Sequence, residues 1–280
     1  MMKYGENTIR CVPYLVLSSA FISASVNAQP LRVDARKDFD TALALFDQAQ
    51  RVQDDLPDRA LQMFRSAAQR LESVVASGIY NGRLEYNLGN CYLQAGDLGR
   101  AILHYRRAER MIPGDELLAA NLAEARRRCL THIPRARSSA FLRSVFFWHH
   151  QTSYGGRIRT ALVAFALIWV CLILRVFLRH RGVALSVVLF AAVAASSGIS
   201  AATTRWTDRN APSGVITAMD VIAYKGPGGG YQKQFEEPLQ PGVEFVVREQ
   251  RGDYRKIELP DGKFGWVEAG AVELILPPQL

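Results

Sequence analysis

The chain has 280 residues, of which 49% are hydrophobic and 21% are charged, and its formal net charge is +8. This composition excludes a collagen and a wholly disordered chain, and four cysteines are too few for a disulfide scaffold. The basic balance permits nucleic acid or an anionic membrane surface as a partner. The hydrophobic residues are unevenly distributed, and they divide the chain into segments of different character.

Residues 1–28 have the pattern of a secretory signal peptide. Lys3 and Arg10 lie in a short basic region, residues 11–26 are uncharged and mostly apolar, and small residues precede a cleavage site before Gln29. A short membrane anchor is the alternative, but an apolar stretch of this length is shorter than the ~20 residues that a spanning helix needs. We therefore expect the chain to be exported.

Residues 35–130 are rich in Ala, Leu, Arg and Glu with an apolar period near 3.6, which predicts helices. Residues 82–115 have the 34-residue spacing of the tetratricopeptide (TPR) pattern. Small residues are expected where two helices cross closely, and Glu85 stands where the pattern commonly has tryptophan. The positions that match the pattern are Leu88, Gly89, Tyr92, Ala101, Tyr105, Ala108 and Pro113.

A weaker copy of this pattern precedes it. Ala60, Phe64 and Ala67 repeat the spacing of the second helix, and residues 41–51 supply the first. Residues 116–129 predict a further helix that closes the stack. We therefore expect an all-α TPR solenoid of about two repeats and a cap, which is near the minimum for a stable stack.

A stacked solenoid exposes a concave face, and such faces often bind peptides. Asparagine and arginine side chains there would hold a partner's carboxylate or its extended backbone. The alternative is ordinary solvated surface. The residues expected on the face are Arg83, Tyr86, Asn90, Gln94, Asn121 and Arg128.

Two further features of this region have alternative interpretations. Residues 100–143 contain ten arginines against four acidic residues. An exported domain favours solvated helices attracted to lipid headgroups over a nucleic-acid site, so no nucleic-acid partner is expected. Cys91 and Cys129 are interpreted as packing residues, although a disulfide bridge between them remains open.

A juxtamembrane linker at 131–159 is followed by two apolar segments. The first, residues 160–178, is uncharged except for Arg175, and the second, residues 182–204, contains no charge. Their length predicts two transmembrane helices, and the short connection between them predicts an antiparallel hairpin. The soluble parts on either side then face the same compartment. Because arginines flank both ends of the hairpin, the signal peptide decides the side, and we expect the inner membrane with both soluble domains extracytoplasmic.

Residues 211–276 contain short β-type runs separated by glycine- and proline-rich turns, and their charge reverses to seven basic against ten acidic residues. The segment resembles a bacterial SH3 (SH3b) domain in its Gly265-Trp266 step and last strand. It predicts a small all-β barrel. Its candidate binding residues are Tyr231, Tyr254 and Trp266.

The full arrangement resembles the BatE-type proteins of the Bacteroides aerotolerance operons, most specifically over residues 84–126. The resemblance implies a scaffold that works beside von Willebrand A domain membrane proteins and a MoxR-type ATPase. The sequence contains no catalytic constellation and no metal cluster, so neither an enzyme nor a cofactor is expected. The expected function is a non-enzymatic, membrane-anchored adaptor of the cell envelope, and the alternative is peptidoglycan binding through the SH3b-like domain.

Overall fold

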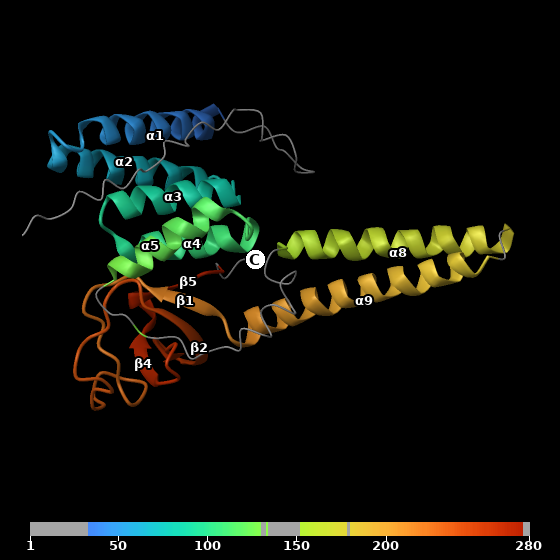
Figure 1. Ribbon diagram of the computed structural model, residues 1–280. Helices are drawn as coiled ribbons and strands as arrows, with labels where there is room; N and C mark the ends of the chain where they lie inside the picture. The colour runs from blue at the N-terminus through green and yellow to red at the C-terminus, as the bar shows by residue number, and fades with distance from the viewer. Residues whose placement is uncertain (1–32, 130–132, 134–151, 178–179, 277–280) are drawn as a thin grey trace, which may run out of the picture. The chain divides into compact units, whose positions relative to one another are not determined.

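The computed structural model describes residues 33–129, 133, 152–177 and 180–276. In these residues the chain is mostly helical, with seven α-helices, two of them long and apolar, and one small antiparallel sheet (Figure 1). This confirms the predicted combination of helices, apolar helix pair and sheet at that coarse level. The predicted signal peptide and most of the linker lie outside the described residues. The chain forms two compact units, divided between Ser77 and Gly78.

The first unit contains a pair of antiparallel helices, α1 (Val33–Val52) and α2 (Pro57–Ala76). Phe46 packs edge-to-face on Phe64, with ring centroids 5.2 Å apart, and both rings are buried. Asp38 on α1 accepts hydrogen bonds from Arg70 and Ser73 on α2. The bond from Arg70, followed by that from Ser73, lowers the pKa of Asp38. The two helices are thus held together by an aromatic contact and by hydrogen bonds to Asp38.

The second unit begins with three helices, α3 (Gly82–Gln94), α4 (Leu98–Met111) and α5 (Glu116–Arg128). Each starts at a side-chain cap, because Asn81, Asp97 and Asp115 accept from the backbone N–H three residues later. The turn between α3 and α4 needs Gly96, whose φ is +76°, and the Asp97 N–H closes it on the Tyr92 carbonyl.

The sheet has five antiparallel strands in the order β4-β3-β2-β1-β5. They are β1 (Ser213–Ile216), β2 (Glu244–Arg251), β3 (Tyr254–Glu258), β4 (Phe264–Glu268) and β5 (Val272–Leu274), and a 3-10 turn at Ala269–Ala271 precedes β5. Alternate side chains of β2 point into an apolar core. That core includes Ile216, Phe245, Val247, Ile257 and Val267. We call residues 211–276 the β domain.

The apolar helices α8 (Tyr154–Phe177) and α9 (Arg181–Asn210) lie side by side as an antiparallel hairpin (Figure 1). Both are long and apolar enough to cross a membrane. α8 starts six residues before the apolar segment predicted at 160, and α9 runs six residues past the segment predicted to end at 204. Two residues, Ala211 and Pro212, separate α9 from β1.

Candidate functional site

Four of the side chains around α3, α4 and α5 form a continuous hydrogen-bonded network. Asn90 Oδ1 accepts from the Tyr105 hydroxyl at 2.8 Å and from Asn121 Nδ2 at 3.0 Å. Asn121 Nδ2 also donates to the Tyr86 hydroxyl at 3.0 Å. The network joins three helices, so its side chains are fixed before any ligand arrives. Three of its members, Tyr86, Asn90 and Asn121, were predicted as binding residues.

The predicted arginines of the same surface lie in ion pairs. Arg83 Nη1 is 3.3 Å from Asp115 Oδ2, and Arg128 Nε donates to Glu124 Oε1 at 2.7 Å. Arg127 donates to the other Glu124 oxygen. The bonds from Arg128 and then Arg127 lower the pKa of Glu124. We use the name α3–α5 face for Arg83, Tyr86, Asn90, Gln94, Asn121 and Arg128.

The residues that matched the repeat pattern lie in the core behind this face. Leu88, Tyr92, Ala101, Tyr105 and Ala108 are buried. Gly89 lies where α3 crosses α4, so close that an added Cβ would overlap the Tyr105 ring. Pro113 follows the last turn of α4. The small residue at the crossing therefore has the packing reason expected from the sequence.

An unexpected feature of this core is a buried pair of titratable residues. His104 Nδ1 on α4 lies 2.7 Å from Glu85 Oε2 on α3, and Glu85 is fully buried. The Tyr92 ring stacks on His104, with centroids 5.3 Å apart. The sequence marked Glu85 only as a departure from the repeat pattern and gave no sign of its partner.

The β domain contacts α4 and α5 through ion pairs that cross between the two. Glu244 on β2 forms ion pairs with two arginines. Its Oε1 lies 2.6 Å from Arg126 Nε, and its Oε2 lies 3.1 Å from Arg106 Nε. Arg107 donates to the carbonyls of Leu274 and Ile275 at the end of β5. These three arginines are partly buried contact residues, so the interpretation as solvated surface is wrong for them, whereas the side chains of Arg100 and Arg127 in the same stretch are exposed.

Two glycines permit this close contact. At Gly99 on α4, an added Cβ would lie 2.8 Å from the carbonyl oxygen of Ile216 on β1. At Gly242, where φ is +95°, it would overlap Cys129 Sγ. Burial, followed by the charge of Glu244, raises the pKa of Cys129 to about 11. Cys91 is buried and both are free thiols, so the structure does not contain the bridge that the sequence left open.

The predicted binding residues of the β domain gather beside its glycine-rich loop. The Tyr231 ring packs on Gly226, and an added Cβ at Gly229 would lie 3.6 Å from the Tyr254 hydroxyl. Tyr254 also meets Tyr224 edge-to-face. Trp266 is buried beneath Arg251, whose guanidinium lies 5.7 Å from the ring centroid. Tyr231, which is 54% exposed, is thus more available to a ligand than Trp266.

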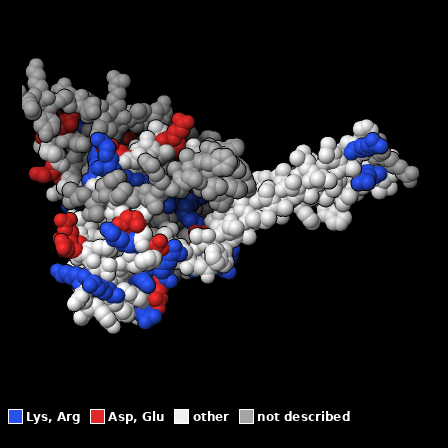
Figure 2. Space-filling model, turned by 60° about the horizontal axis from the view of Figure 1, so that its bottom comes forward, with Lys and Arg blue, Asp and Glu red and all other residues white. Residues whose placement is uncertain are grey.

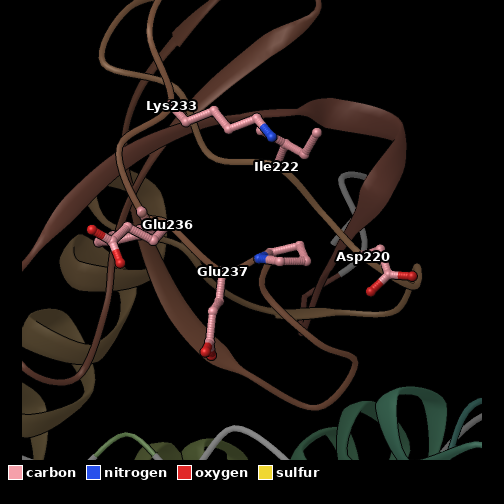
Figure 3. A pocket seen from close by; sticks show the side chains of 7 residues that line it. Asp220, Ile222, Lys233, Glu236 and Glu237 are labelled. Carbon is pink, nitrogen blue, oxygen red and sulfur yellow. The ribbon is translucent and has the colours of Figure 1, made fainter.

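A small pocket of about 130 Å³ opens elsewhere on the β domain (Figure 3). Ile222, Phe235 and Pro238 give it apolar walls, and acidic side chains stand around it. In Figure 3 the carboxylates of Glu236 and Glu237 point in different directions. Its lining residues are Asp220, Ile222, Lys233, Phe235, Glu236, Glu237 and Pro238.

The two apolar helices meet along a seam of small residues. On α9, Ser197, Ser200 and Ala201 are buried. Arg157 on α8 enters this seam and donates to the Ser200 and Thr204 hydroxyls, each at 2.9 Å. The α8 positions that face the seam have the four-three spacing of a left-handed helix pair. They are Arg157, Ala161, Ala164, Ile168 and Cys171.

The outer surface of this hairpin is apolar. Leu162 and Phe165 are more than half exposed, as are many of their neighbours. In Figure 2 the hairpin is an uncharged projection with basic side chains at its far end. At the other end, Arg110 on α4 pairs with Asp208 on α9. This ion pair connects α4 to the hairpin, and the sequence did not predict it.

Within the described ranges, no group of three or more His, Cys, Asp or Glu side chains is placed to hold a metal ion. His149 and His150, a histidine pair for which the sequence predicts no metal site because no Cys, Asp or Glu lies nearby, are outside the described residues. Comparisons with protein families, curated proteins and solved structures find no match to this chain.

Proposed function

We propose that this chain is a non-enzymatic, membrane-anchored scaffold of the bacterial cell envelope that binds a protein partner through the α3–α5 face. The observation that carries the proposal is the network of Tyr86, Asn90, Tyr105 and Asn121, in which two buried tyrosines hold two partly exposed asparagines in a fixed polar surface shared by three helices. Such a surface loses little conformational entropy when a ligand binds.

The fold assignments behind this proposal are part of it. We infer that α1–α5 are TPR repeats with a capping helix, supported by the helix–turn–helix pairs and the close crossing at Gly89. We infer an SH3-like barrel for the β domain, supported by its five short antiparallel strands. The resemblance to BatE-type proteins suggests von Willebrand A domain proteins and a MoxR-type ATPase as partners.

The apolar hairpin supports the membrane location. Anchoring confines the chain and any membrane-bound partner to one surface, which raises their effective concentration, so a weak contact suffices. We propose the bacterial inner membrane, with α1–α5 and the β domain on the extracytoplasmic side. Alkaline phosphatase fused after Leu280, and separately after Arg137, should be active in both fusions.

Co-purification from detergent-solubilised membranes tests the binding role. The Asn90→Ala/Arg128→Ala chain should lose a partner that the wild type retains, because it removes an amide and a guanidinium of the face. Each lost hydrogen bond costs about 0.5–1.5 kcal/mol, and more where the guanidinium is the donor. Tyr231→Ala, an exposed change in the β domain, should retain it. The reverse pattern would assign binding to the β domain.

A second candidate function, peptidoglycan binding, rests on the tyrosines beside the glycine-rich loop. Tyr224, Tyr231 and Tyr254 combine ring faces with hydroxyl groups, and the acidic pocket of Figure 3 offers carboxylates to an amine. The full chain would then sediment with purified peptidoglycan, and Tyr231→Ala would reduce the bound fraction. Equal sedimentation of both chains would exclude this site.

A further inference from the structure

We infer that the α3–α5 face binds an extended peptide segment through the peptide's main-chain N–H and C=O groups, which would meet Asn121 and Asn90. A terminal carboxylate is not needed. This inference rests on the proposed function, because it specifies what the same face recognises.

The hydrogen bonds of the two asparagines fix which groups remain for a ligand. Asn90 Oδ1 accepts two bonds, so its amide orientation is set, and its Nδ2 group has no partner among the described residues. Asn121 Nδ2 uses both of its protons, on Tyr86 and on Asn90, and its Oδ1 likewise has no partner within the described ranges. The face therefore presents one donor group and one acceptor.

These two groups match a single residue of an extended chain. Asn121 Nδ2 lies 3.0 Å from Asn90 Oδ1, so the two amides are adjacent. In an extended strand, the N–H and C=O of one residue point to the same side. The Asn90 amide can donate to that C=O while Asn121 Oδ1 accepts from that N–H. Both asparagines are half-buried, so a bound peptide would shield these bonds from water.

The charges of the face disfavour a carboxylate ligand. The centre of the face, at Tyr86, Asn90 and Asn121, is uncharged. Arg83 is paired with Asp115, and Arg127 and Arg128 share Glu124. A carboxylate would have to compete with acidic side chains that already hold these arginines. An uncharged main chain avoids that competition.

Asn90→Asp isolates the outward donor. The aspartate keeps an acceptor for Tyr105 and Asn121 but removes the amide group that would meet the peptide carbonyl. Gln250→Glu is the control, because it adds the same charge at an exposed position of β2, outside the α3–α5 face, and leaves the Asn90 amide in place. Equal melting temperatures of the two variants and the wild type would show that the fold is retained.

The probe comes from a phage-displayed library of linear dodecapeptides, panned on the detergent-solubilised full chain. Peptides that also bind the Asn90→Ala/Asn121→Ala chain are discarded. A retained peptide is synthesised with an acetylated N-terminus and an amidated C-terminus, and its affinity is measured by fluorescence anisotropy. Single N-methylations along the peptide then remove one main-chain N–H at a time.

We expect the capped peptide to bind and one central N-methylation to weaken its binding roughly tenfold or more. Asn90→Asp should weaken binding similarly, while Gln250→Glu should not. A requirement for the free carboxyl terminus, or a flat N-methylation series, would overturn the main-chain inference while leaving partner binding at the face intact. Failure to recover any peptide that depends on Asn90 and Asn121 would contradict this inference, whereas the co-purification test decides the proposed function separately.

Discussion

Glu85 and His104 form a close pair in the core between α3 and α4, with 2.7 Å between Glu85 Oε2 and His104 Nδ1. Both side chains are less than a tenth exposed. Desolvating such groups is costly, and the cost is offset only while each has its partner. Their bond therefore joins α3 to α4 in the core.

Glu85→Ala should strongly destabilise the helical part of the second unit. It leaves the buried Nδ1 of His104 without its hydrogen-bond partner, at a cost of about 1–3 kcal/mol. Glu85→Gln should cost less, because the amide still offers a hydrogen-bonding atom to Nδ1. Thermal unfolding of the solubilised chain, followed by circular dichroism, measures the difference. Equal melting temperatures for the alanine variant and the wild type would show that the pair is not structurally important.

Gly89→Leu should disrupt the α3–α4 crossing. A leucine side chain would enter the space of the Tyr105 ring, and overpacking typically costs about 1–3 kcal/mol. Ala119→Leu is the control, since Ala119 is exposed on α5. The melting temperature should fall for the glycine variant alone; an unchanged value would mean that α4 moves away without cost.

Glu244→Gln should loosen the contact between the β domain and the helices. The substitution removes the negative charge that Arg106 and Arg126 share, in a site that is largely shielded from solvent. We expect a loss of about 1–3 kcal/mol and faster amide hydrogen exchange in α4, α5 and β2. Glu268→Gln, at an exposed position of β4, should leave exchange unchanged. Identical exchange in both variants would argue against this contact.

Cys129 should react slowly with iodoacetamide at neutral pH. Its pKa of about 11 lies two units above the reference value of 9.0, so the reactive thiolate is about a hundredfold scarcer. The reaction should accelerate as the pH rises towards 11. Peptide mass mapping separates Cys129 from the other cysteines, and the denatured chain gives the reference rate. Rapid labelling of the folded chain at pH 7 would contradict the burial of this thiol against Gly242.

Sequence periodicity was sufficient for the local elements. The helical periodicity of residues 82–115, the small residue Gly89 and the uncharged run at 182–204 are all short-range signals, and the structure contains helices at these positions. The contacts between segments were missed, because Arg126 and Glu244 are more than a hundred residues apart. The opposite charge balance of the two regions was a signal for that contact, but it does not specify which residues meet.

For the candidate site, too, the sequence predicted which residues share a surface but not their ion-pair partners. Repeat spacing brought Tyr86, Asn90 and Asn121 to one surface, and the structure joins them directly. Spacing cannot show that Arg83 and Arg128 are held by Asp115 and Glu124, since those ion pairs depend on side-chain conformation.

Site-specific photocrosslinking in intact membranes tests the central claim, that the α3–α5 face is the partner-binding surface, most directly. Benzoylphenylalanine is placed at Gln94 on the face and, in a second chain, at Tyr231 on the β domain. We predict that one protein is crosslinked from position 94 and not from position 231, and that Asn90→Asp removes that product without lowering the amount of chain in the membrane. A product that forms from position 231 and persists with Asn90→Asp would contradict the account.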